Sequence, residues 1–469
     1  MGTQKSIFKL FLSNGGKSIL VFLGTAIFAR ELGPNNLGKY FLYMAFIGIV
    51  SVISDLGVRG ALEKRISESS NGEGYLILGI LLKILIILPV IITLYGFKSE
   101  IEGYLDANIF YLVIIGVFLL EFAHLPEAIL RGQGRVGDTA TPQFFRYAIW
   151  VVVGYILINM GFNYRGLVYS ALLGLFAMGI WNGYRIEINP SLPNMGQIYS
   201  IIDYSKFNFI SDLNWYLHNW TDVLIIGVFL TSLEVGGYEV AWRASMILTL
   251  LSGAVGTAIF PRVSYLDSKN QYEKITQLLK DSHVQSLLLT VPGFAGVFLL
   301  SEDILKFLFG EEYTFASLVL VILCCQKVLY SFYIVYSRAL HGLDRPDLAA
   351  RAKITSVISN IILNIIFVYY IGIIGAAFAT LISFTINTLL VHKYLTSIIN
   401  IEYPIVDILW IALATSGMGV CVYVSTIVLP IKGILSLVVV VFIGSATYML
   451  IILLRESTRE VVLRFIAEL

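Results

Sequence analysis

Charged side chains interrupt the apolar runs of this sequence. Lys17, Asp55 and Arg59 lie in or beside two long apolar segments between Gly16 and Arg65. A charge at the centre of a membrane-spanning helix costs about 3 kcal/mol on insertion scales, so it faces protein or water rather than lipid. Such residues are candidates for polar chemistry inside a membrane.

One apolar run, 206–230, carries an unusually polar stripe. At helical spacing its polar residues fall within about 80° of arc, and they are Asn208, Asp212, Trp215, Asn219 and Asp222. We expect this face to line a water-filled cavity in which Trp215 and Asn219 contact a substrate. Asp212 and Asp222 would then bind a coupling cation. The alternative is a hydrogen-bonded seam between two helices.

The run 106–130 holds a second group of titratable residues, Glu121, His124, Glu127 and Arg131. Glu121 lies deeper in the run and is a third candidate for cation coupling. The alternative is a structural pair with a neighbouring helix. Glu127 and Arg131 fall near the end of the run, where we expect them to be hydrated.

Basic residues inside apolar runs suit an anionic substrate. Arginine and lysine in a low-dielectric cavity form charge-assisted hydrogen bonds with phosphate or diphosphate. Each residue alone would equally fit a structural ion pair, but the set favours substrate binding. Its members are Lys17, Arg146, Arg243 and Lys327 within the runs, and Arg30 at a helix end.

Signatures of catalysis and of resident metals do not occur. Asn14–Ser18 resembles the end of a phosphate-binding loop, but Phe11 stands where its first glycine belongs. The three cysteines lie in apolar runs without metal-ligand spacing. We therefore predict no catalytic residue, no metal site, no enzyme activity and no nucleic-acid partner; the sole cofactor considered is a coupling Na⁺ or H⁺.

The elements that position these residues are membrane helices. The chain has 469 residues, 57% hydrophobic and 13% charged, with a mean hydropathy of +0.82, whereas a soluble protein carries about 25% charged residues. The sequence predicts an all-α polytopic membrane protein of about fourteen spans. Their approximate limits are 8–31, 37–60, 75–97, 106–130, 140–161, 164–184, 206–230, 236–261, 280–300, 314–338, 352–371, 373–396, 406–428 and 433–454.

The distribution of charge predicts the orientation. Most of the 32 lysines and arginines fall in segments on the same side as the N-terminus. The excess of positive charge marks the cytoplasmic side. We expect a multi-pass protein of the cytoplasmic membrane with both termini in the cytoplasm.

Three pairs of similar segments, about 200 to 210 residues apart, indicate an internal duplication. They are Ala128–Arg135 with Arg338–Arg345, Arg165–Ala171 with Ile374–Thr380, and Leu37–Tyr40 with Val235–Tyr238. The repeat unit is about six helices, an even number, so the two copies are parallel. We predict an N-terminal six-helix lobe at 1–200, a second at 201–400, and an extra helix pair with a short tail at 401–469.

Three motifs resemble a known family. Ala29–Tyr40 (ARELGPNNLGKY), Ser54–Gly57 and Leu130–Arg135 are similar to motifs of Wzx-type polysaccharide flippases. These belong to the multidrug/oligosaccharidyl-lipid/polysaccharide (MOP) exporter superfamily. The resemblance implies a V-shaped pair of bundles with a central cavity that alternates between the membrane faces. Its cargo would be a polyprenyl-linked oligosaccharide, with membrane lipid around it and an association with glycan-assembly enzymes.

On that picture Lys17, Arg30 and Arg243 are the candidates for phosphate contact, and Asp212 and Asp222 for cation coupling. Two other functions stay open. A multidrug or metabolite antiporter of the same superfamily would prefer acidic cavity walls, whereas the charges here are mixed. A membrane glycan polymerase or ligase would need a sizeable loop outside the membrane, and every loop here is short.

Overall fold

Every regular element in the described part of the chain is a helix. The computed structural model describes residues 2–69, 72–188 and 190–461, with side chains from Gly16 onward. The first helices are α1 (Gly2–Asp55), α2 (Val58–Glu68), α3 (Tyr75–Gly96), α4 (Lys98–Tyr104), α5 (Phe110–Gly132), α6 (Val136–Asn159), α7 (Asn163–Tyr184), α8 (Met195–Phe229) and α9 (Ser232–Ser245). The rest are η1 (Met246–Leu248), α10 (Thr249–Asp267), α11 (Tyr272–Leu308), η2 (Glu311–Ala316), α12 (Ser317–Gly342), α13 (Pro346–Thr396), α14 (Ile405–Val428) and α15 (Ile434–Leu453).

The prediction of an all-α polytopic membrane protein is confirmed. Eleven helices among the described residues are long and apolar enough to cross a membrane. Two of them each cover two predicted spans, because α1 is non-helical at Gly33 and α13 at Ile371 and Gly372. The more polar α8 corresponds to the predicted span 206–230.

The predicted span 37–60 needs a correction. The helix ends at Asp55, and α2 begins at Val58. Leu56 and Gly57 between them are both left-handed, with φ of 47° and 78°. A left-handed leucine is unfavourable by about 1–2 kcal/mol, so hydropathy alone does not reveal this break.

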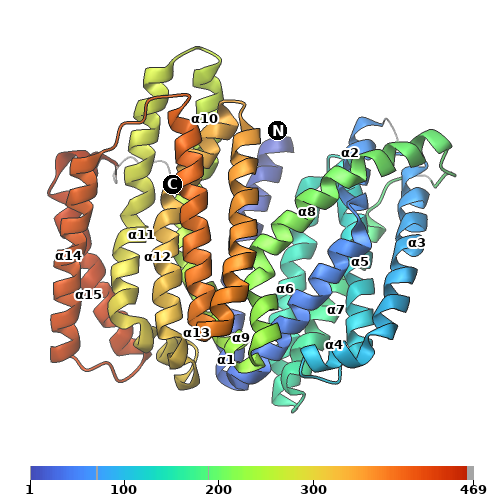
Figure 1. The fold of residues 1–469 in the computed structure, drawn as a ribbon, viewed down its shortest axis with the longest axis horizontal. Coiled ribbons are helices and arrows are strands. Elements are labelled where there is room, and N and C mark those ends of the chain that lie inside the picture. The colour runs from blue at the N-terminus through green and yellow to red at the C-terminus, as the bar shows by residue number, and fades with distance from the viewer. Residues whose placement is uncertain (1, 70–71, 189, 462–469) are drawn as a thin grey trace. The chain divides into compact units, whose positions relative to one another are not determined.

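The chain divides into two compact units, Met1–Gly236 and Gly237–Leu469. In the first unit α8 packs against α1 and α2, which is why that unit extends beyond residue 200. The second unit ends with α14 and α15, which pack on each other and on α11 (Figure 1). The division into two six-helix lobes and a terminal pair stays a prediction.

The similar segments Ala128–Arg135 and Arg338–Arg345 end with the same helix-ending turn. In the first copy Gly134 is left-handed (φ 74°), and in the second copy Asp344 is (φ 55°). The backbone N–H of Arg135 donates to Leu130 O at 3.0 Å, and that of Arg345 donates to Leu340 O at 2.9 Å. The local sequence therefore specifies one helix-ending turn twice.

Gly38 and Gly236 come from the similar segments Leu37–Tyr40 and Val235–Tyr238. Both lie where two backbone segments of the first unit pack closely together. A Cβ added to Gly38 would overlap the carbonyl oxygen of Ser232, and one added to Gly236 would overlap that of Pro34. Each glycine thus lets one backbone segment approach the other more closely than any side chain would allow.

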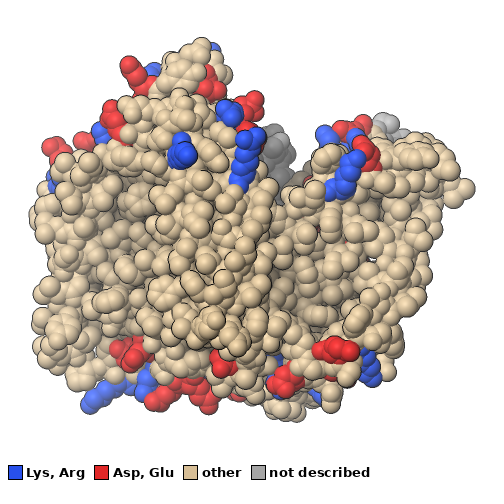
Figure 2. Space-filling view, in the orientation of Figure 1, with Lys and Arg blue, Asp and Glu red and all other residues tan. Residues whose placement is uncertain are grey.

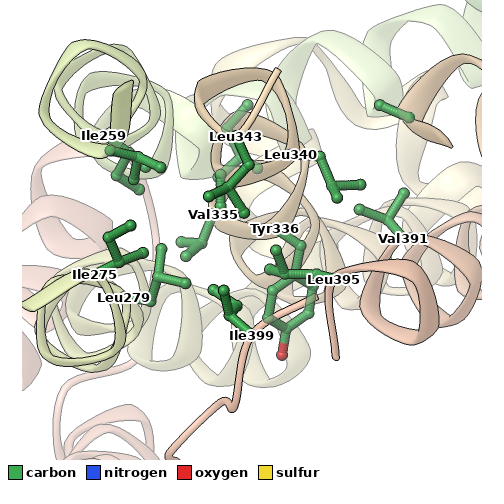
Figure 3. Packing of buried hydrophobic residues seen from close by; sticks show 14 of the residues in the cluster. Ile259, Ile275, Leu279, Val335, Tyr336, Leu340, Leu343, Val391, Leu395 and Ile399 are labelled. Carbon is green, nitrogen blue, oxygen red and sulfur yellow. The ribbon is translucent and has the colours of Figure 1, made fainter. Parts of the chain in front are cut away.

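Apolar side chains hold the second unit together. Figure 3 shows side chains of α10, α11, α12 and α13 pointing toward one another, among them Ile259, Leu279, Leu340 and Val391. In each unit, charged atoms gather near the helix ends on the face shown in Figure 2, and the belt between them is uncharged. This pattern fits helices whose middle parts lie in hydrocarbon.

Candidate functional site

Four helices of the first unit bring charged side chains into one buried group, the α1–α5 ion cluster, formed by Asp55, Arg59, Lys83 and Glu121. The Lys83 ammonium donates to Asp55 Oδ1 and, at 2.5 Å, to Glu121 Oε2. Arg59 Nε lies 3.0 Å from Asp55 Oδ1. Ser51 Oγ donates to Glu121 Oε1 at 2.6 Å. The cluster is therefore a lysine held between two carboxylates.

Two members of the cluster, Lys83 and Glu121, lie well inside membrane-spanning helices, whereas Asp55 ends α1. Lys83 is about 12 Å along α3 from Tyr75, and Glu121 is about 16 Å along α5 from Gly132, at 1.5 Å per residue. Asp55, Lys83 and Glu121 are 1%, 6% and 4% exposed. Buried charges are tolerated when they are paired and hydrogen-bonded, and this arrangement supplies both conditions.

The break between α1 and α2 places Arg59 in the cluster. Asp55 ends α1, and its Oδ1 accepts the backbone N–H of Arg59 at 3.2 Å in the first turn of α2. A carboxylate at this position interacts favourably with the positive end of the helix dipole. Gly57 lets this break pack on α8, because a Cβ there would overlap the carbonyl oxygen of Ser205.

Of the three predicted coupling residues, Glu121 belongs to this cluster and Asp212 interacts with it electrostatically. Glu121 is a member, and its ion pair with Lys83 matches the structural alternative that the sequence left open. Asp212 on α8 is half-buried and interacts electrostatically with Asp55, Arg59 and Lys83. Its role in coupling stays a prediction.

Sequence reasoning missed Lys83. The signal was present, since Lys83 is the one charged residue in α3, whose other residues are almost all apolar. A lone lysine in such a helix requires a buried partner. The partners lie 28 and 38 residues away in sequence, so no spacing rule identifies them.

The expectation that Glu127 is hydrated is wrong. Glu127 is 4% exposed and accepts hydrogen bonds from three side chains. His124 Nδ1 lies 2.9 Å from Oε2, while Arg131 and Gln143 both donate to Oε1 at 2.5 Å. The packing of α6 on α5 covers this carboxylate, and its three partners replace water.

Two predicted substrate-binding residues of the first unit, Lys17 and Arg146, lie against the same aromatic ring. The Lys17 ammonium lies 5.0 Å from the centre of the Tyr147 ring, and the Arg146 guanidinium lies 5.3 Å from it. Cations are attracted to the face of an aromatic ring at such distances. Both cations thus lie against the Tyr147 ring, and their positive charges suit an anion.

In the second unit, the predicted basic residues have their own partners. Arg243 Nε lies 3.0 Å from Glu239, a buried residue one helical turn earlier. Lys327 is buried, with its ammonium 3.7 Å from the centre of the Trp242 ring. The sequence does not predict this role for Trp242, because a tryptophan in an apolar run has no distinguishing spacing.

The remaining predicted residues lie on α8 and at the end of the first half of α1. Trp215 is 59% exposed, and Asn219 donates to the Trp215 carbonyl oxygen at 2.7 Å. Asp222 is half-buried, and Arg30 is exposed just before the break at Gly33. Asn219 therefore bonds along its own helix, and Trp215 leaves its ring accessible.

The second unit contains an apolar cavity of about 540 Å³, bordered by α10, α11, α14 and α15. Its lining includes Leu288, Pro292, Gly296, Val422 and Met449. Such a surface suits a hydrocarbon chain. No group of three or more metal-binding side chains occurs among the described residues.

Solved structures with this fold are membrane flippases and multidrug transporters. The chain is similar to the lipid II flippase MurJ in an inward closed conformation, with a TM-score of 0.81 and 19% identity over 97% of this chain and 99% of that one. An inward-facing multidrug transporter of the MOP superfamily matches with a TM-score of 0.63 and 18% identity, over 81% of this chain and 95% of that one.

The sequence comparisons are more specific. Residues 3–267 match the polysaccharide biosynthesis protein family, and 209–366 match the MatE family. The chain is 38% identical, over 98% of both chains, to the probable low-salt glycan biosynthesis flippase Agl15 of Haloferax volcanii. It is 28% identical to the probable flippase AglR of the same organism, over 97% of this chain and 98% of that one.

The chain therefore belongs to the polysaccharide biosynthesis protein family, within the MOP superfamily. The resemblance predicted from the three sequence motifs is confirmed.

Proposed function

We propose that this protein is a flippase that moves a polyprenyl-(di)phosphate-linked oligosaccharide across the cytoplasmic membrane for glycan assembly. The observation that carries the proposal is the full-length similarity to a relative named as a glycan biosynthesis flippase. The fold alone is less specific, because multidrug transporters have it too.

The structure offers features that suit each part of such a substrate. Lys17 and Arg146 on the Tyr147 ring would contact the phosphate, and Arg30 would assist at the helix end. Arg243 and Lys327 are further candidates for this role, and Trp215 and Asn219 for sugar contact. Polar and basic walls replace the hydration that sugar and phosphate lose in the membrane.

The apolar cavity of the second unit would accept part of the lipid chain. Hydrocarbon gains about 25 cal/mol for each Å² removed from water, but inside a bilayer the benefit is positioning rather than burial. The cavity would hold the lipid beside the protein while the headgroup crosses.

Movement of the headgroup would be driven by a Na⁺ or H⁺ gradient. Asp212, Asp222 and Glu121 are the proposed coupling residues, with Glu121 acting through Lys83. Both termini would be cytoplasmic. The partners would be glycan-assembly enzymes that act before and after the oligosaccharide crosses the membrane. The protein itself would catalyse no covalent reaction.

A complementation experiment tests the proposal. This chain would be expressed in a Haloferax volcanii strain that lacks Agl15, and the low-salt glycan would be measured by mass spectrometry of glycoproteins. Restored glycan supports the proposal. Normal amounts of membrane-inserted protein without any glycan, together with no translocation of lipid-linked oligosaccharides in reconstituted vesicles, would refute it.

The match of residues 209–366 to the MatE family favours a second candidate, a cation-coupled multidrug or metabolite antiporter. In a host that lacks its own drug pumps, an antiporter would raise resistance to cationic dyes, whereas a glycan flippase would leave resistance unchanged.

A further inference from the structure

Two histidines and two tyrosines of the second unit form a group outside the candidate sites described above. This His–Tyr cluster consists of His283 on α11, Tyr336 on α12, His392 on α13 and Tyr403 in the linker between α13 and α14. The ring centres of His283 and Tyr336 lie 5.0 Å apart, and those of Tyr336 and His392 lie 5.4 Å apart. The ring centre of Tyr403 lies 6.1 Å from that of His283 and 6.2 Å from that of His392. Four segments of the chain therefore meet at one point.

One nitrogen of the cluster has no hydrogen-bond donor. His283 is fully buried, and its Nδ1 lies 2.6 Å from the carbonyl oxygen of Leu279. Nδ1 therefore carries a hydrogen, because a carbonyl oxygen only accepts. In the neutral imidazole Nε2 is then an acceptor, and it has no hydrogen-bond partner among the described residues. A buried acceptor without a donor is costly, so a donor at this nitrogen would stabilise the cluster.

A chain of hydrogen bonds leads from the protein surface toward this nitrogen. His392 Nε2 lies 2.5 Å from the Tyr403 hydroxyl, and Tyr403 is hydrogen-bonded to Tyr336. His392 is half-buried and Tyr403 is 38% exposed, whereas Tyr336 is 3% exposed. A tyrosine hydroxyl both donates and accepts, and a neutral imidazole nitrogen can accept, whereas a protonated histidine only donates. The protonation of His392 therefore decides the direction of the chain.

We propose that the His–Tyr cluster is a pH-responsive clasp, in which protonated His392 donates to Tyr403 and the reversed chain delivers the Tyr336 hydroxyl hydrogen to His283 Nε2. An N–H bond forms at His392 Nε2 with a proton taken from water. Each tyrosine keeps one hydrogen and only rotates its O–H bond. This inference goes beyond the proposed function and is independent of the transported cargo.

The surroundings of His392 suit a single added proton. Histidine is the side chain whose charge ordinarily changes between pH 5 and 8. The rings of Tyr336 and Tyr403 lie close enough to attract an imidazolium charge. His283 faces His392 from α11, and two imidazolium charges would repel each other, so the pair binds one proton rather than two. The charged groups beside the cluster, Lys280 on α11 and Glu402 in the linker, pair with each other at 3.2 Å.

The clasp would control how firmly the linker at 397–404 is held. Two other contacts already tie the linker to α11: Thr276 Oγ1 donates to the carbonyl oxygen of Asn400 at 2.9 Å, and Lys280 pairs with Glu402. Tyr403 adds a third tie close to the start of α14. Because α11 and α14 both border the apolar cavity, a tighter linker at low pH would hold α14 against α11 beside that cavity.

Hydrogen–deuterium exchange of the full-length protein in lipid nanodiscs tests the clasp without any glycan substrate. The amides of Ile398, Ile399 and Ile405 are hydrogen-bonded in or beside the linker, so their exchange reports its opening. Lowering the pH from about 8 to about 6 should protonate His392. After correction for the chemical exchange rate, exchange should slow about fivefold, the effect of one added hydrogen bond. His392→Gln and Tyr403→Phe should both remove this pH response.

His283→Phe keeps an aromatic ring in the cluster but removes Nε2, so it should remove the response too. Tyr403→Phe changes one atom of a partly exposed side chain and serves if His283→Phe does not fold. His341→Gln is the matched control, because His341 is an exposed histidine on α12 whose Nδ1 contacts the Ser337 carbonyl oxygen; the response should be unchanged. A response that survives in any of the three cluster variants, its absence in the wild type, or its loss in His341→Gln would overturn the proposal.

Discussion

Replacing Lys83 by methionine would remove the cation that two buried carboxylates share. Methionine is of similar length, so the packing of α3 changes little, but Asp55 and Glu121 lose their common partner. Removing one member of a buried ion pair costs about 3–5 kcal/mol, because the remaining charge stays buried. At about 2–4 °C per kcal/mol for a unit of this size, the melting temperature should fall by about 6–20 °C.

The second variant that tests this reasoning is Lys83→Met/Glu121→Gln. It removes one positive and one negative charge, and Asp55 keeps Arg59 as its partner. This variant should recover more than half of the lost stability, a coupling that only residues in contact show. Lys64→Met is the matched control: its pair with Glu68 is solvent-exposed, so its effect should stay below about 1 kcal/mol.

Melting would be followed by intrinsic fluorescence of the purified protein in detergent. If Lys83→Met has the same melting temperature as the wild type, Lys83 is not buried between the two carboxylates and the cluster is wrongly assigned. If the double variant is as unstable as Lys83→Met, the loss comes from packing rather than from unpaired charge.

Three further substitutions probe other parts of the molecule. Tyr147→Leu removes the ring shared by two cations and should reduce glycan transfer several-fold at unchanged protein abundance; unchanged transfer would exclude these cations from the site. Gly296→Leu adds an apolar side chain to the cavity lining, at a position where an added Cβ meets no atom within 4 Å, and should weaken transport; Gly253→Leu, where a Cβ is equally free but lies outside the cavity lining, should not. Gly38→Ala places a methyl group against the Ser232 carbonyl oxygen and should lower the melting temperature; an unchanged value would argue against this close crossing.

The membrane character and the family of this protein follow from the sequence. Hydropathy is a sum over neighbouring residues, so the spans are readable without any knowledge of packing. The turn after α5 is equally local, because Gly134 adopts the left-handed conformation that ends the helix. The motifs around Ala29–Tyr40 and Leu130–Arg135 identified the family for the same reason.

The partners of the buried charges were decided by tertiary structure. A lysine inside α3 indicates that a buried counter-charge exists, but not where it comes from. Its partners are on α1 and α5. Which helices pack against α3 depends on side-chain fit along their whole lengths, and no periodicity in one segment encodes it. For that reason the sequence indicated polar chemistry within the membrane, while only the fold placed Lys83 between Asp55 and Glu121.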